Sequence, residues 1–87
     1  MAQYRNKALL KAIGLVAKEL RQSKKLSLES VTNDYNLKND HNLHFARIEQ
    51  GNGNMTVSTL SLLCRYYDIS LTDFFRKVDA VLQAGKV

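Results

Sequence analysis

Proline is absent from this 87-residue sequence, and glycine occurs only four times. Both residues gather in turns and interrupt helices, so their scarcity favours helices over a turn-rich sheet. The length suits one domain with a single modest core, and a hydrophobic content of 45% with 24% charged residues is ordinary for a soluble globular protein. We therefore expect one all-α domain over residues 1–87, with a core from about residue 9 to about residue 78 and loose ends.

Cysteine and long apolar runs are also scarce. The single cysteine, Cys64, excludes an internal disulfide and a zinc site built on a cysteine pair. Cys64 falls on an apolar helical stripe, where a small buried residue is expected rather than a nucleophile. No apolar run approaches the roughly 18 residues of a membrane span, and the first residues carry lysines too often for a signal peptide. We expect a cytoplasmic protein without membrane contact.

Catalytic patterns are missing as well. The sequence has no glycine-rich phosphate loop, carboxylate dyad or catalytic triad pattern, so we expect no enzyme, no cofactor and no small-molecule ligand. His41 and His44 lie three residues apart with Asp40 adjacent, a spacing that suits two metal ligands on one helical face. A metal site needs a third or fourth convergent ligand, and the sequence nearby offers none. We therefore expect no metal.

Positive charge is present and unevenly distributed. Of the net charge of +5, residues 1–25 carry +6 from seven basic residues and one glutamate, whereas the remaining residues sum to −1. A basic end next to a nearly neutral remainder fits a polyanionic partner such as nucleic acid, and it equally fits a solvated lysine-bearing helix.

Apolar spacing and turn residues predict five short helices. The expected elements are a helix over Tyr4–Ser23, a second capped by Ser27, a third from Asp40 or His41 to Gly51, a fourth over Thr56–Tyr67, and a fifth opened by Ser70 with Asp73 as a capping pair. The fifth helix is expected to bury Leu71, Phe74, Phe75 and Val78. Its stripe of Phe75, Val78, Val81 and Leu82 could form a dimer surface or close the core of its own chain.

Three segments resemble a known family. They are ELRQSKKLS at Glu19–Ser27, FARIEQG at Phe45–Gly51 and TVSTLSLLCRYYDISLTDFF at Thr56–Phe75. Together they are similar to the Cro and phage-repressor type of helix-turn-helix DNA-binding domain, the xenobiotic-response-element family, over roughly Ile13–Phe75. The resemblance implies a compact lambda-repressor-like bundle whose third helix binds DNA.

The resemblance also implies an ion pair. Arg21 and Glu49 match family positions where an arginine of the first helix pairs with a glutamate near the end of the recognition helix. The physical requirement agrees, because a carboxylate beside the core residue Ile48 stays ionised only at a cost unless it has a partner, and arginine offers bidentate geometry.

Residues that contact DNA in the family map onto one short segment of this chain. The implied base-contacting residues are His41, Asn42, Leu43, His44 and Arg47. Leu43 could touch a thymine methyl group or simply pack. The expected phosphate-contacting residues are Lys24, Lys25, Asn52 and Asn54, although the two lysines could instead only cap the first helix.

Two departures from the family pattern bear on this transfer. About three extra residues separate Val31 from Phe45, which lengthens the turn or delays the third helix and can shift the groove-facing residues. Leu28 stands where many members have a glutamine that touches a phosphate, so that contact should be missing.

The sequence thus predicts a repressor-like transcriptional regulator that binds a palindromic double-stranded DNA operator as a homodimer. The alternative is an antitoxin-like or adaptor module that keeps the scaffold but binds a protein. The sequence does not specify the operator, the regulated genes, activation against repression, an inducer, or the dimer interface.

Overall fold

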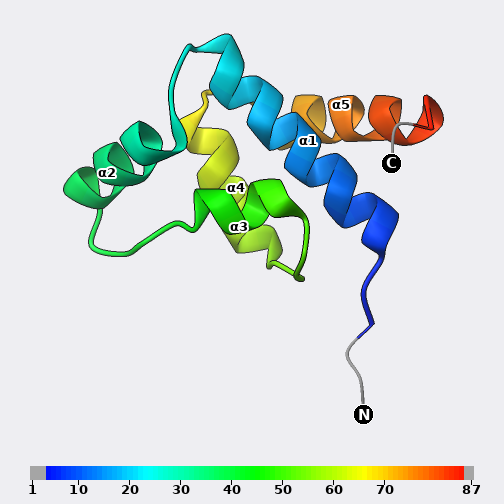
Figure 1. The fold of residues 1–87 in the computed structure, drawn as a ribbon, viewed down its shortest axis with the longest axis horizontal. Helices are drawn as coiled ribbons and strands as arrows, with labels where there is room; N and C mark the ends of the chain where they lie inside the picture. Colours follow the sequence, from blue (N-terminus) through cyan, green and yellow to red (C-terminus); the bar gives the residue numbers. More distant parts are fainter. Residues whose placement is uncertain (1–3, 86–87) are drawn as a thin grey trace.

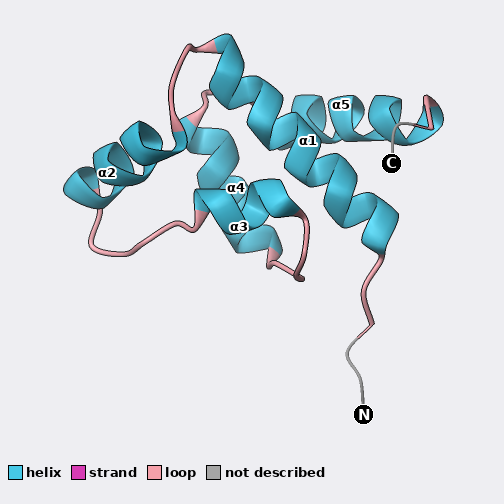
Figure 2. Ribbon diagram, in the orientation of Figure 1, coloured by secondary structure: helices cyan, strands magenta, loops and turns pink. Residues whose placement is uncertain are grey.

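Helices account for all regular structure in the part of the chain that is described. The computed structural model describes residues 4–85, and within them it contains five α-helices and no strand (Figures 1 and 2). The helices are α1 (Lys7–Ser23), α2 (Leu28–Lys38), α3 (Phe45–Gln50), α4 (Val57–Tyr66) and α5 (Leu71–Gln83). The all-α prediction is confirmed. The looseness expected of the chain ends falls in part on residues 1–3 and 86–87, which lie outside the described residues.

Side-chain caps fix where four of the helices begin. The capping oxygens belong to Asn6, Ser27, Thr56 and Ser70, each of which accepts from a backbone N–H one turn into its helix. The predicted capping roles of Ser27 and Ser70 are confirmed. The reciprocal bond expected from Asp73 is not formed. The Asp73 carboxylate lies 3.4 Å from the Arg76 guanidinium.

The hydrophobic core forms around α1, which packs against α3 and against α5 (Figure 1). Buried apolar residues from all five helices meet there, and no polar or charged residue among those described is fully buried. The largest side chains with less than 2% exposure are Phe45, Phe74, Leu63, Val16, Val31 and Val78. Burial of such side chains is the main force that holds short helices together, since helices of this length are marginal alone.

The third helix begins later than the sequence predicted. It was expected to start at Asp40 or His41, but it starts at Phe45, a delay that the extra residues between Val31 and Phe45 allowed for. Residues 39–44 form a connection of bends and irregular backbone. The backbone of Asn39 is extended, with φ −134° and ψ 155°, which ends α2. Leu43 within this connection is only 4% exposed. Tertiary burial of Leu43 therefore competes with local helix formation and prevails.

The fifth helix buries fewer residues than predicted. Phe74 and Val78 are buried as expected, whereas Leu71 and Phe75 are each 37% exposed. The buried positions follow the spacing of one helical face, and Phe75 lies about 100° around the helix from Phe74. Val81 also packs into the core of its own chain, which accounts for part of the apolar stripe without a partner.

Candidate functional site

The short helix α3 is held in place by aromatic side chains. Phe45, at its first position, is 1% exposed and packs edge-on against three tyrosines. The ring centroids of Tyr35, Tyr66 and Tyr67 lie 5.8, 5.3 and 6.0 Å from that of Phe45. Edge-to-face aromatic pairs stabilise each other beyond simple area burial. A six-residue helix can therefore present its outer face in a fixed orientation.

The carboxyl-terminal end of α3 lies directly on α1. A Cβ atom added at Gly14 would be 2.5 Å from the backbone oxygen of Glu49 and 2.9 Å from that of Ile48, so only glycine fits there. Gly51 ends α3 with φ 66° and ψ 28°, a left-handed conformation that glycine adopts without strain. These two glycines let the backbones of α1 and α3 approach closely.

Arg21 and Glu49 are brought together across the same contact. Arg21 Nε donates to Glu49 Oε2 at 2.8 Å, and Arg21 Nη2 donates to Glu49 Oε1 at 3.0 Å. Their side chains are 12% and 8% exposed. The remaining guanidinium nitrogen, Nη1, donates to the backbone oxygen of Leu26 at 2.8 Å. The hydrogen bonds to Glu49 raise the pKa of the Arg21 guanidinium, which therefore stays charged.

The connection from α2 to α3 is tied to Tyr35. The Tyr35 hydroxyl lies 2.7 Å from His41 Nε2, and the two rings pack edge-on at 5.5 Å. Asn39 Nδ2 donates to the backbone oxygen of Tyr35 at 2.9 Å. One ring nitrogen of His41 is therefore engaged by its own chain. Leu43 was expected either to touch a thymine methyl group or to pack. It is buried in the core, so it packs.

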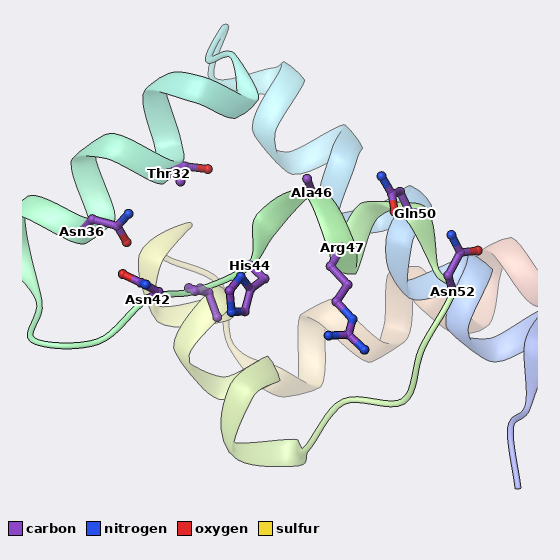
Figure 3. A pocket seen from close by; sticks show the side chains of 9 residues that line it. Thr32, Asn36, Asn42, His44, Ala46, Arg47, Gln50 and Asn52 are labelled. Atoms are coloured by element: carbon purple, nitrogen blue, oxygen red, sulfur yellow. The ribbon is translucent and has the colours of Figure 1, made fainter. Parts of the chain in front are cut away.

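An open groove lies between α2 and α3 (Figure 3). It has a volume of about 610 Å³, and Figure 3 shows Thr32 and Asn36 on α2 opposite the side chains of α3. The residues that line this α2–α3 groove are Thr32, Asn36, Asn42, Leu43, His44, Ala46, Arg47, Gln50 and Asn52. All except Thr32 and Leu43 are exposed. The groove therefore displays amide, imidazole and guanidinium groups and, among the described residues, no carboxylate.

The polar side chains of this groove differ in their hydrogen bonding from other polar side chains of the described residues. Elsewhere in the chain, backbone atoms form hydrogen bonds with the side-chain amides of Asn6, Asn39 and Asn54. In contrast, no hydrogen bond within residues 4–85 engages the groove's own polar side chains. These are Thr32, Asn36, Asn42, His44, Arg47, Gln50 and Asn52. Free amides of this kind can each donate and accept a hydrogen bond.

Arg47 occupies the centre of the exposed face of α3. Its guanidinium lies over Gly53, where an added Cβ would be 3.4 Å from Nη2. Among the described residues no carboxylate pairs with it. Arg47 also borders a second groove, of about 360 Å³, on the other side of α3, together with His41, Met55 and Thr59. The guanidinium of Arg47 can therefore contact a ligand in either of the two grooves that flank α3.

The residues expected to contact phosphate lie in two places. Lys24 and Lys25 form the exposed turn between α1 and α2, with Lys25 in the left-handed region at φ 58°. The backbone N–H of Lys24 donates to Arg21 O and that of Lys25 to Gln22 O, so their backbones close α1 while their side chains stay exposed. Asn52 borders the α2–α3 groove, whereas Asn54 Nδ2 donates to the backbone oxygen of Tyr4 at 2.7 Å.

Three polar groove residues were not predicted from the sequence. Gln50 follows Arg47 by three positions on α3, so helical spacing alone could have indicated it. Thr32 and Asn36 are four residues apart on α2, beside the buried Val31 and Tyr35. Their contribution depends on how α2 packs beside α3, which helical spacing within one segment does not specify.

Two further tyrosine environments adjoin the site. Burial and a hydrogen bond to Asp34 Oδ2, at 2.8 Å, raise the pKa of Tyr66 to about 12. The same hydrogen bond, followed by that from Lys38, lowers the pKa of Asp34. The Tyr67 hydroxyl is buried and has no hydrogen-bond partner within residues 4–85, and this burial raises its pKa above the ordinary value. These hydroxyl groups therefore stay protonated near neutral pH.

Three further features concern the cysteine, possible metal ligands and possible membrane-spanning helices. Cys64 is buried, and burial raises the pKa of its thiol, which disfavours the reactive thiolate. Over residues 4–85, no three side chains among His, Cys, Asp and Glu gather closely enough to hold a metal ion. In the same range no helix combines the length and apolar character needed to cross a membrane.

Comparison with known proteins gives no assignment to set beside this geometry. Neither a protein-family model, nor a curated protein, nor a solved structure matches the chain.

Proposed function

We propose that the protein is a sequence-specific double-stranded DNA-binding regulator of the lambda-repressor-like helix-turn-helix type. In this proposal α2 and α3 are the two helices of the motif, and α3 enters the major groove. The observation that carries the proposal is the set of polar side chains along α3 and its groove that make no hydrogen bond within residues 4–85. Arg47, at the centre of this set, has no ion-pair partner in the same range. Base edges in the major groove present the hydrogen-bond partners that such side chains lack.

Each side chain has a role that its chemistry fits. Arg47 suits the two acceptors of guanine, while Asn42 and Gln50 suit the donor and acceptor of adenine. His44 can donate to a base or to a phosphate. His41, bound to the Tyr35 hydroxyl, has one ring nitrogen left for such a contact. The rigid attachment of α3 to α1 would keep these groups in one register.

Phosphate contacts supply affinity in this proposal. Lys24 and Lys25 offer exposed ammonium groups, and Asn52 offers an unengaged amide at the end of α3. Asn54 has one amide hydrogen remaining after its bond to Tyr4. Such contacts fix register and orientation without reading sequence.

The proposal includes a homodimer. Two copies related by a twofold axis would bind half-sites about 34–36 Å apart. The candidate surface is the outer face of α5, where Leu71 and Phe75 are each 37% exposed. The oligomeric state in solution, with and without a palindromic duplex, tests this part. If a monomer binds a single half-site, the proposed homodimer is wrong, while α3 remains the proposed DNA-binding element.

Salt dependence tests the function itself. Binding to a duplex should weaken steeply as salt rises, with a slope of about −0.9 in log K against log salt for each phosphate contacted. Arg47→Ala should lower affinity for a preferred duplex by about 1–3 kcal/mol while leaving the fold intact, because Arg47 is exposed. Lys77→Ala on α5, outside both grooves, is the matched control.

A protein-binding module on the same scaffold is the competing function. It predicts no measurable affinity for any duplex at low salt and an interaction that tolerates high salt, because apolar contacts are not screened by ions. The salt titration therefore separates the two functions.

A further inference from the structure

The amino-terminal end of α1 adjoins the loop that follows α3. A Cβ atom at Gly51 would lie 2.9 Å from Lys11 Cα and 2.9 Å from Leu10 O, so the two backbones are in contact. Asn54 Nδ2 donates to the backbone oxygen of Tyr4, which ties the segment before α1 to the same loop. Figure 1 shows this segment, in blue, descending on the side of the α3–α4 loop. Asn52, between these two contacts, borders the α2–α3 groove.

This adjoining segment carries only positive charge. Arg5, Lys7 and Lys11 are exposed, and the first acidic residue along the described chain is Glu19. None of the three basic side chains takes part in an ion pair within residues 4–85. The loop at Gly51–Met55, to which the segment is attached, has no acidic residue either. We call Arg5, Lys7 and Lys11 the basic edge.

We infer that the basic edge binds phosphates of the DNA that flank the bases contacted by α3. The inference rests on the proposed function and extends its phosphate-contacting surface from the loop at Asn52 onto α1. Duplex DNA carries one negative charge per about 1.7 Å of its axis, so a duplex seated on α3 presents phosphates to any surface that borders the helix. The attachment of the edge to Gly51 and Asn54 places its charges beside that duplex without a separate folding step.

The basic edge serves affinity and orientation rather than choice of sequence. Ammonium groups act as point charges toward phosphate oxygens, and phosphate contacts carry no direct sequence information. Removal of the edge should therefore weaken binding to preferred and scrambled duplexes by the same factor, whereas removal of Arg47 should change their ratio.

The test compares two variants that lose the same charge. R5Q/K7Q/K11Q removes the basic edge. R65Q/R76Q/K77Q removes three exposed charges from α4 and α5, at positions that line neither groove. Affinity of the full chain for a preferred duplex and for a scrambled one is measured between about 50 and 200 mM salt, the range in which counterion release is resolved. Circular dichroism and thermal unfolding check that both variants fold.

The expected result is a slope of log K against log salt that is shallower by about 1.8–2.7 for R5Q/K7Q/K11Q, the loss of two to three phosphate contacts. The control variant should keep the wild-type slope. An unchanged slope in R5Q/K7Q/K11Q, or an equal change in both variants, would overturn the inference while leaving the proposed function intact. Absence of any duplex binding by the wild-type chain would overturn the proposed function, and this inference with it.

Discussion

Arg21 on α1 and Glu49 at the end of α3 are joined by two hydrogen bonds, of 2.8 and 3.0 Å, from one guanidinium to both carboxylate oxygens. The same guanidinium donates to Leu26 O, so one side chain links α1, α3 and the segment that leads into α2. This linkage fixes the position of the exposed face of α3 relative to the rest of the protein. The carboxylate in FARIEQG is thus part of the attachment of the helix, while Arg47 and Gln50 of the same helix face the groove.

Glu49→Ala is expected to destabilise the fold by about 3 kcal/mol, because it leaves the largely buried Arg21 charge without its partner. Both side chains are still about a tenth exposed to solvent, which puts the cost at the lower end of the range for a broken buried pair. DNA affinity should fall through loss of folded protein. Urea unfolding measures the change, with the exposed Glu29→Ala as control. A free energy of unfolding equal to that of the wild type would show that the pair has no structural role.

Gly14→Ala is expected to destabilise the protein although alanine favours helices. Helix propensity alone would stabilise α1 by about 1 kcal/mol. The added Cβ would lie 2.5 Å from Glu49 O, however, and α3 must shift to relieve this overlap. Overpacking of this kind costs about 1–3 kcal/mol, which outweighs the propensity gain. The free energy of unfolding measures the balance, with Lys18→Ala on the exposed face of α1 as comparison. A more stable Gly14→Ala variant would contradict the close contact.

Tyr35→Phe tests whether the α2–α3 connection needs its anchor. The variant removes the hydroxyl that lies 2.7 Å from His41 Nε2 but keeps the ring packed on Phe45. We expect a loss of about 1 kcal/mol in stability, typical of one hydrogen bond, and a weaker affinity for a preferred duplex because Asn42 and His44 become less well positioned. Duplex affinity and thermal unfolding are measured together, with the exposed Tyr4→Phe as control. Unchanged affinity would show that the hydrogen bond does not position the connection.

The Tyr66–Asp34 hydrogen bond predicts a pH dependence of stability. The pKa of Asp34 is lowered in the folded state, so its contribution is present above the ordinary carboxyl value and is lost as pH falls through the lowered pKa. The pKa of Tyr66 is raised to about 12, so its contribution is present below the ordinary value of about 10 and is lost as pH rises toward 12. The stability difference between wild type and Tyr66→Phe should therefore be largest between about pH 4 and 10.

Unfolding in urea at about pH 3, 7 and 11 would measure that difference in the acid, plateau and alkaline ranges. The pKa of Tyr67 is also raised, and its largest cause, burial, is common to wild type and Tyr66→Phe. A difference that stays constant over all three pH values would contradict the assignment of the hydrogen bond.

The sequence predicted the helices better than their surroundings. Local signals such as Ser27, Ser70 and Gly51 mark helix ends through hydrogen bonds or conformations formed within a few residues. The predicted start of α3 was wrong because Leu43 is held by tertiary packing, which local spacing does not encode. For the candidate site, the α3 side chains follow from helical spacing. The contribution of Thr32 and Asn36 does not, because it depends on how two helices pack.

Selection of binding sites from random duplexes at low salt tests the central claim most directly. The account predicts enrichment of an inverted repeat whose half-sites are centred about one helical turn apart. It also predicts that Arg47→Ala loses the preference at one position in each half-site, since one guanidinium contacts one guanine. Absence of any enriched sequence for the folded wild-type protein would contradict the claim that the exposed face of α3 binds specific DNA.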